Sequence, residues 1–320
     1  MKKDLPYYIY CFTHLKRDMK NGGAPHKPIL ILGLIEMFET QIFYNNQIYI
    51  LPELVSSFKT HWNELVKTNH HPIFALPFYH LNSEPFWKLI PNLGCEKWIE
   101  SKSSMRSFNN LTTAVNFTLI DNELRELLEI KENRSVLKFA ILDKYFPETK
   151  MLFGSIADNS QNIDVLNEPT EIYRQKIIEL KNRLDENAFQ EEVFLRSGIF
   201  KREIPKIYNN TCAISGLRVD AILNISMIDA CHIVPFSEGY NDTLINGFAL
   251  CPNLHRAFDR GLISISNDYK VVINNNFVEN KNSTLNLNQF KDKLLNLPKN
   301  NEFHPSLENF KHHRKRFGFE

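Results

Sequence analysis

The stretch that decides the fold runs from residue 229 to residue 259. It begins Asp-Ala-Cys-His-Ile-Val-Pro at 229–235, passes through Asn246, and ends Leu-Cys-Pro-Asn-Leu-His-Arg-Ala-Phe-Asp at 250–259. Asn246 and His255 follow His232 after 14 and 23 positions. The apolar neighbours of His232 predict a strand, and Asn246 lies in the connection that follows it. The stretch therefore predicts a strand, a loop, a second strand and a helix.

His232 and Asn246 suit different tasks in a site that hydrolyses a phosphodiester. Histidine takes up a proton near neutral pH, so His232 is the candidate general base. On a strand, its neighbours Cys231 and Ile233 face the opposite side. The amide of Asn246 can tie the loop backbone, which would keep His232 and the helix in register.

The helix of this stretch carries a candidate metal site. Pro252 predicts its start and Gly261 its end. Asp259 follows His255 after four positions, so both side chains share one helical face. An imidazole and a carboxylate there can bind one divalent ion and leave positions open for water and phosphate. Asp259 has an alternative role, a salt bridge at the helix end to Arg256 or Arg260.

With these residues in place, the C-terminal part of the chain resembles HNH nucleases of the ββα-metal fold. A longer pattern is similar to the HNH domains at the C-terminus of modification-dependent restriction enzymes, over roughly residues 189–320. It comprises Cys212-Ala-Ile-Ser-Gly, Cys231-His-Ile-Val-Pro, Asn246-Gly-Phe-Ala-Leu-Cys and His255-Arg-Ala-Phe-Asp-Arg-Gly. The resemblance implies His232, Asn246 and His255 as catalytic residues, His255 as a metal ligand, Mg²⁺ or Mn²⁺ as cofactor, and products with 5′-phosphate and 3′-hydroxyl ends.

One position departs from this family pattern. Many HNH sites have an aspartate directly before the first histidine, where this chain has Cys231. A thiolate can bind a soft metal but is a poor ligand for Mg²⁺, so a small buried residue is the preferred interpretation. Asp229 is a weaker candidate for the missing carboxylate.

Many HNH domains also hold a structural zinc with two Cys-x-x-Cys pairs. Here Ser215 stands three positions after Cys212, and Leu254 stands three positions after Cys251, where the second cysteine of each pair would be. Both half-sites lack their second thiolate. We therefore expect no structural zinc.

Three stretches near the N-terminus resemble, in order, the sulfur-binding domain of restriction enzymes that recognise phosphorothioated DNA, over about residues 5–150. They are Ala24-Pro-His-Lys-Pro28, Leu76-Pro-Phe-Tyr-His-Leu81 with Trp87, and Lys144-Tyr-Phe-Pro-Glu-Thr149. In that family an apolar cup that includes a proline receives the sulfur. Sulfur is less strongly hydrated than oxygen, so its burial costs less.

Carried over to this chain, the resemblance implies five DNA-binding residues. Leu76 and Pro77 would line the cup, His26 and Lys27 would supply polar and cationic contacts, and Arg106 would touch backbone or base. Leu76 replaces the usual aromatic residue, and Lys27 replaces an arginine and cannot form its bidentate fork. Alternatives are that these residues belong to the core, that another DNA feature is read, or that this part binds a protein.

Length and composition set the frame for these motifs. The chain has 320 residues, a net charge of +1 and five cysteines. It suits two domains without a disulfide framework. We saw neither a signal peptide nor a membrane span and expect a cytoplasmic protein. Because the net charge is low, DNA binding must come from local patches such as the basic run at 311–316. The alternative interpretation of this run is a solvated tail.

The expected fold class is α+β, with a mostly helical DNA-recognition domain at 1–165, a helical connector at 166–188 and a ββα-metal HNH domain at 189–320. The alternative interpretation of residues 166–188 is a surface helix of the second domain. Helices are expected at 7–18, from Pro28 to Phe38, and at 52–66, 121–130, 132–146 and 171–186. Strands are expected at 76–81 and 86–89, and a hairpin joins 263–265 to 270–273.

The resulting hypothesis is a modification-dependent restriction endonuclease that cuts phosphorothioated double-stranded DNA, with a homodimer as a possible partner arrangement. Two rivals stay open. One is an HNH endonuclease that reads an unmodified sequence or a modified base, and the other is a catalytically inactive DNA-binding protein.

Overall fold

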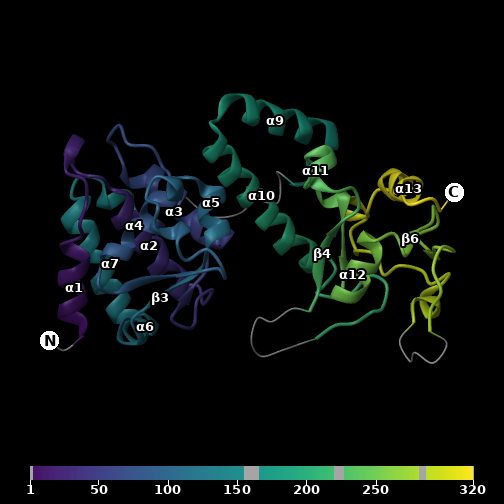
Figure 1. Ribbon diagram of the computed structural model, residues 1–320, viewed down its shortest axis with the longest axis horizontal. Helices are drawn as coiled ribbons and strands as arrows, with labels where there is room; N and C mark the ends of the chain where they lie inside the picture. The colour runs from purple at the N-terminus through teal and green to yellow at the C-terminus, as the bar shows by residue number, and fades with distance from the viewer. Residues whose placement is uncertain (1–2, 155–165, 220–226, 281–285, 320) are drawn as a thin grey trace. The chain divides into compact units, whose positions relative to one another are not determined.

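The computed structural model describes residues 3–154, 166–219, 227–280 and 286–319. Helices alternate with short antiparallel sheets, which confirms the α+β class. The chain divides into two compact units (Figure 1). The first comprises Met1–Asp158 and Leu184–Leu195, and the second comprises Asn159–Arg183 and Arg196–Glu320. The expected boundary at residue 165 lies outside the described residues, and the predicted domain limits remain predictions.

The first unit is built around one buried helix, α2 (His26–Glu39), which packs against α3 (Pro52–Leu65) and α7 (Lys131–Tyr145). Its sequence is apolar on all sides, so burial was expected and is confirmed. A sheet of three antiparallel strands has the order β1-β3-β2. The other elements are α1 (Leu5–Thr13), α4 (Ala75–His80), α5 (Phe108–Ala114), α6 (Asn122–Glu129), β1 (Gln47–Ile48), β2 (Trp87–Pro91) and β3 (Val115–Ile120).

The strand predicted at 76–81 is wrong, because residues 76–80 belong to α4 and Leu81 begins a 3-10 turn. The apolar pattern there fits two periods. Phe74 and Phe78 are both fully buried and four positions apart, which is helical spacing. Pro77 lies in the first turn, where a missing N–H is tolerated. The Trp87 indole then donates to the Phe78 carbonyl over 3.0 Å and joins the helix to β2.

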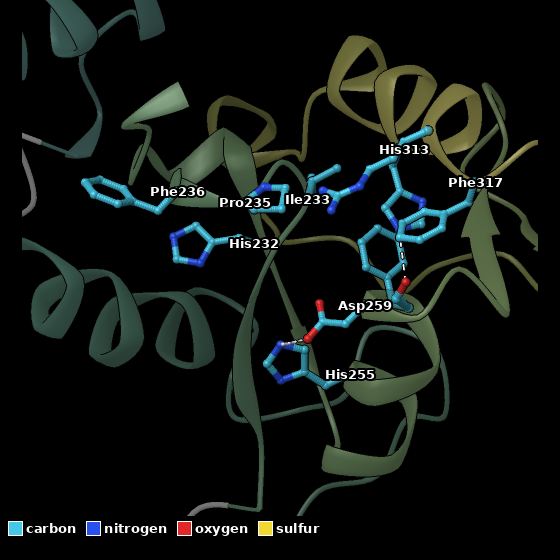
Figure 2. Close-up of a pocket in the computed structure, with 10 residues that line it drawn as sticks. His232, Ile233, Pro235, Phe236, His255, Asp259, His313 and Phe317 are labelled. Carbon is cyan, nitrogen blue, oxygen red and sulfur yellow. Dashed lines mark hydrogen bonds and ion pairs between the residues drawn. The ribbon is translucent and has the colours of Figure 1, made fainter. Parts of the chain in front are cut away.

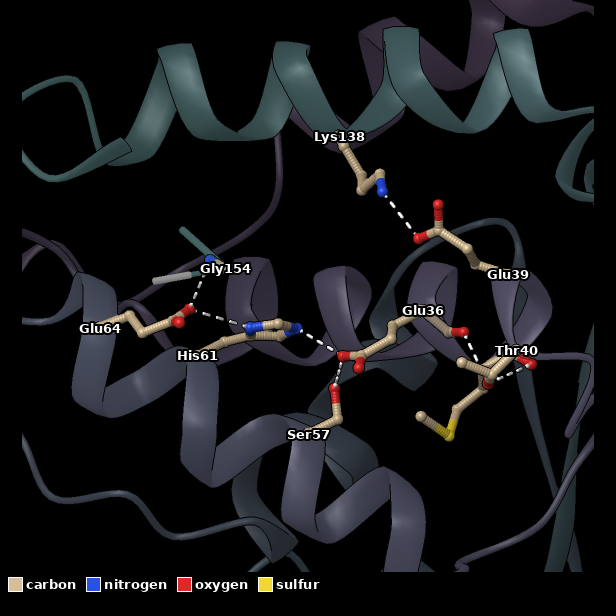
Figure 3. A network of polar contacts seen from close by, with 9 residues as sticks. Glu36, Glu39, Thr40, Ser57, His61, Glu64, Lys138 and Gly154 are labelled. Carbon is tan, nitrogen blue, oxygen red and sulfur yellow. Dashed lines mark hydrogen bonds and ion pairs between the residues drawn. The ribbon is translucent and has the colours of Figure 1, made fainter. Parts of the chain in front are cut away.

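A network of polar side chains ties α2 to α3 (Figure 3). The two ring nitrogens of His61 lie 2.8 Å from a Glu36 carboxylate oxygen and 3.4 Å from one of Glu64. Ser57 donates to the same oxygen of Glu36, and the Gly154 N–H donates to Glu64. Buried polar groups are tolerated when partnered in this way, so the network fixes the register of the two helices.

The second unit holds the residues of the 229–259 stretch. Strands β4 (Asp229–His232) and β5 (Gly247–Leu250) pair antiparallel, and α12 (Pro252–Asp259) packs against both. Gly261 adopts φ 65°, so the predicted helix end is confirmed. The predicted hairpin is also confirmed, as β6 (Ile263–Ile265) pairs with β7 (Val271–Ile273).

The remaining helices of this unit are α11 (Phe236–Gly239), α13 (Leu307–Arg316) and α9 (Thr170–Arg183), the last of which was predicted. The sequence did not reveal α10 (Glu186–Ile207), a long helix whose first part belongs to the first unit and whose remainder belongs to the second. Among the described residues, no helix combines the length and apolar composition needed to cross a bilayer.

Candidate active site

Strand β4 sends its polar side chains to two sides. Asp229 and Cys231 point toward α12, and His232 points away from them, as the two-residue period of a strand requires. His232 is paired with Gly247 across the sheet. A Cβ at Gly247 would lie 2.6 Å from the Phe200 ring, so only glycine lets α10 approach this end of the sheet.

The approach of α10 fixes the His232 ring. The Phe200 ring stacks on it at 3.9 Å between centroids and 10° between planes. The Nε2 atom lies 2.7 Å from Oδ1 of Asp242, a carboxylate that is only 1% exposed. An ionised carboxylate only accepts hydrogen bonds, so Nε2 carries the proton and Nδ1 is left as the proton acceptor. His232 thus has the tautomer of a general base.

Asn246 holds the loop between the two strands. Its side chain is fully buried, and its Oδ1 accepts from the Val234 N–H and from the Asn309 amide, both at 3.0 Å. Its Nδ2 donates to the carbonyls of Val234 and Asn241, both at 2.9 Å. Because Val234 is two residues from His232, and Asn241 is next to Asp242, the amide holds both members of the His–Asp pair.

His255 lies between two carboxylates. Its Nδ1 is 3.2 Å from Oδ2 of Asp229, which is a hydrogen bond, and its Nε2 is 3.4 Å from Oδ2 of Asp259. Asp229 therefore accepts the hydrogen bond that Nδ1–H of His255 donates, and the lone pair of Nε2 faces Asp259. Two ligands at about 2.1 Å from one tetrahedral ion are about 3.4 Å apart, so this spacing suits a shared metal ion. The ion pair that Asp259 forms in the structure is with His255, rather than with Arg256 or Arg260 as in the alternative interpretation.

Cys231 joins this group. Its Sγ, a ring nitrogen of His255 and a carboxylate oxygen of Asp259 lie within 4.8 Å of one another. It is the one such set of three or more possible ligands within the described residues. Ligand atoms around one tetrahedral ion are about 3.3–3.8 Å apart, so side-chain shifts of about 1 Å would close the site. Cys231 is fully buried, and burial together with Asp259 and Asp229 raises the pKa of its thiol.

Of these residues, His232, His255 and Asp259 line one pocket of about 280 Å³ (Figure 2). Figure 2 shows His255 and Asp259 facing each other, with His232 on another side of the pocket. Arg316 also lines the pocket and pairs with Glu238, while Arg314 of the same basic run is buried. The other lining residues are Ile233, Pro235, Phe236, Phe258, His313 and Phe317.

The thiols of the suspected zinc half-sites lie apart from this cluster. Cys212 is buried, and its hydrogen bond with Cys251 lowers the pKa of its thiol. Ser215, which replaces a zinc ligand of the family pattern, places its hydroxyl 4.0 Å from the Cys251 sulfur. The expected absence of a structural zinc remains a prediction.

In the first unit, His26 and Lys27 are buried rather than open to a ligand. The Lys27 ammonium lies 2.6 Å from Glu84 and 2.9 Å from the Ser83 hydroxyl. His26 hydrogen-bonds the His71 carbonyl at 2.8 Å, and burial lowers its pKa to about 4, so it is neutral at pH 7. Their DNA contacts remain predictions.

The other three predicted DNA-binding residues differ in exposure. Leu76 is half-buried, Pro77 is buried within α4, and Arg106 is exposed. Burial and the charges of Lys27, Lys102 and Arg106 lower the pKa of His80. The structure thus brings Arg106 into electrostatic range of His80 at the end of α4, a neighbour that sequence reasoning missed.

Asp242 and Phe200 were also missed. Asp242 lies ten positions after His232 in a loop without periodicity, and Phe200 lies on a helix outside the motif. The only available signal was an acidic residue within the span between His232 and Asn246.

Comparison with known proteins gives results at two levels. Residues 212–266 match a family model described as HNH endonuclease. Among solved structures, a modification dependent TagI restriction endonuclease is similar at 23% identity and a TM-score of 0.31, over 38% of this chain and 38% of that chain. A comparison with curated proteins gave no match. With the ββα arrangement of β4, β5 and α12 described above, residues 212–266 form an HNH endonuclease domain.

Proposed function

We propose that the protein is a restriction endonuclease that hydrolyses phosphodiester bonds in phosphorothioated double-stranded DNA. One observation carries the hydrolytic part of the proposal. His232 and the His255–Asp259 pair border the same pocket within the HNH domain. A general base and a place for a cation are the two aids that attack of water on a phosphodiester anion needs.

The chemistry follows from the groups in the pocket. Nδ1 of His232 takes a proton from the attacking water, and the Asp242 carboxylate stabilises the positive charge that forms on the ring. The leaving oxygen receives its proton from solvent. A divalent ion held by His255 and Asp259 would neutralise charge on the phosphate. Asn246 keeps the base in place, and Asp229 orients His255.

The first unit is proposed to select the modified DNA. The resemblance of its three stretches to sulfur-binding domains supports this role, as do the exposed Arg106 and the nearby His80. A phosphorothioate would place its sulfur against Leu76 and Pro77. Two copies of the chain would act together on foreign DNA, because one HNH site cuts one strand.

A second candidate has a specific observation in its favour. Glu84 already neutralises the ammonium of Lys27 at 2.6 Å. A cation engaged in a buried pair is a weak attractor for a modified phosphate, because breaking the pair leaves an unpaired buried charge. This favours an HNH endonuclease that reads an unmodified sequence or a modified base.

Two plasmids of identical sequence, one phosphorothioated and one not, separate the candidates. Each is incubated with the full-length protein and a divalent ion, and His232→Ala serves as the control. We expect cleavage of only the modified plasmid, and none by His232→Ala. Equal cleavage of both plasmids would refute sulfur recognition and leave the nuclease. Cleavage of neither, with intact DNA binding, would refute the nuclease.

A further inference from the structure

A buried thiol, that of Cys231, lies beside the two candidate metal ligands His255 and Asp259. Cys231 is on β4 and faces α12, and its sulfur lies within 4.8 Å of ligand atoms of both His255 and Asp259. The sulfur's own hydrogen bond is weak, since it donates to the His232 carbonyl over 3.6 Å. Little would therefore be lost if the sulfur turned to a metal ion.

We infer that Cys231 is a ligand of this metal centre and that its sulfur makes the centre prefer borderline ions, such as Co²⁺ or Zn²⁺, over Mg²⁺. The inference rests on the proposed function for the purpose of the site, but its ligand set stands on geometry alone. An imidazole, a carboxylate and a thiolate suit a borderline ion. Mg²⁺ instead requires oxygen ligands in an octahedron.

The surroundings of the cluster support three protein ligands. Asp229 hydrogen-bonds Nδ1 of His255, so Nε2 is the atom directed at the ion. Asp259 approaches that Nε2 from the last turn of α12. His255 and Asp259 border the pocket, whereas Cys231 lies on the buried side of the site. A fourth position toward the pocket would then remain for water or phosphate, as in catalytic sites with three protein ligands. The thiol proton leaves to solvent when the ion binds.

The test is a titration of the metal-free, full-length protein with Co²⁺ under anaerobic conditions, followed by absorption spectroscopy. A sulfur ligand gives a thiolate-to-cobalt charge-transfer band in the near ultraviolet. We expect this band in the wild-type protein, its loss in Cys231→Ser, and a Co²⁺ affinity about 10- to 100-fold lower in that variant. Zn²⁺ should displace Co²⁺, and a large excess of Mg²⁺ should not.

Cys251→Ser is the matched control, because Cys251 is a free thiol of the same domain that lies outside the cluster. The band should persist in it. Absence of the band in the wild-type protein, or its loss in Cys251→Ser with retention in Cys231→Ser, would overturn the inference, as would displacement of Co²⁺ by Mg²⁺. Because the wild-type spectrum is itself decisive, a folding defect in one variant does not protect the inference. DNA cleavage is measured separately, so a thiolate–cobalt band without cleavage would refute the proposed function alone.

Discussion

Replacement of Asp242 by asparagine isolates the partner of the general base. Asp242 is buried, and its Oδ1 accepts from Nε2 of His232 over 2.7 Å. Asparagine has nearly the same shape and can still accept this bond, but it carries no charge. The variant should therefore keep the fold and the DNA affinity, while the positive charge that forms on His232 during the reaction loses its stabilising neighbour.

The expected loss follows from the type of bond. A hydrogen bond to a charged group contributes about 1.5–3 kcal/mol, against about 1 kcal/mol for a neutral one. The difference is about 0.5–2 kcal/mol, and each 1.36 kcal/mol is tenfold in rate, so Asp242→Asn should slow cleavage roughly 2- to 30-fold. The assay is single-turnover cleavage of a labelled duplex, with the dissociation constant for DNA measured by fluorescence anisotropy. Nitrogen NMR of the His232 ring should show that the Nε2–H tautomer is kept, because the asparagine oxygen still accepts this bond.

Asp268→Asn is the control, because Asp268 is an exposed aspartate of the same unit outside the pocket. It should cleave at the wild-type rate. A wild-type rate in Asp242→Asn with the tautomer kept would refute the role given to Asp242.

Three further predictions concern stability and packing. Burial raises the pKa of Glu191 from 4.5 to about 7, so the unfolded chain loses this proton at a lower pH than the folded chain does. The stability of the first unit should therefore fall by at most about 3 kcal/mol as the pH rises from about 4.5 to about 7. Glu191→Gln should remove this dependence in urea unfolding followed by tryptophan fluorescence, since all three tryptophans lie in that unit. Asn246→Ala should destabilise the HNH domain by about 3 kcal/mol, measured by calorimetry, because it leaves buried backbone groups unpaired; an unchanged transition would contradict the loop tie. Gly247→Ala should displace Phe200 from His232, lower the free energy of unfolding by about 1–3 kcal/mol and slow cleavage without weakening Co²⁺ binding. Weakened Co²⁺ binding would contradict the separation of the general base His232 from the metal site at His255 and Asp259.

The sequence predicted what short-range patterns control. His232, Asn246 and His255 stand on the expected strand, loop and helix, because strand alternation, Pro252 and Gly261 act over a few residues. The pairing of His255 with Asp259 follows from helical spacing. These features need no knowledge of distant parts of the chain.

The features that the sequence did not predict depend on distant parts of the chain. Phe200 reaches His232 only because α10 crosses the sheet end at Gly247. Lys27 was expected to contact DNA, and the sequence did not reveal its pairing with Glu84, which is 57 positions away. The stretch at 76–81 fitted both a strand and a helix, and the buried Phe74–Phe78 face decided in favour of the helix.

The most direct test of the account is the rate at which the protein hydrolyses a cleavable, end-labelled DNA duplex in Mn²⁺ or Co²⁺, with and without His232. We predict 5′-phosphate products and a fall of about 10²–10⁴-fold in His232→Ala, at unchanged DNA affinity. Cleavage by His232→Ala at the wild-type rate would contradict the assignment of His232 as the general base of this domain.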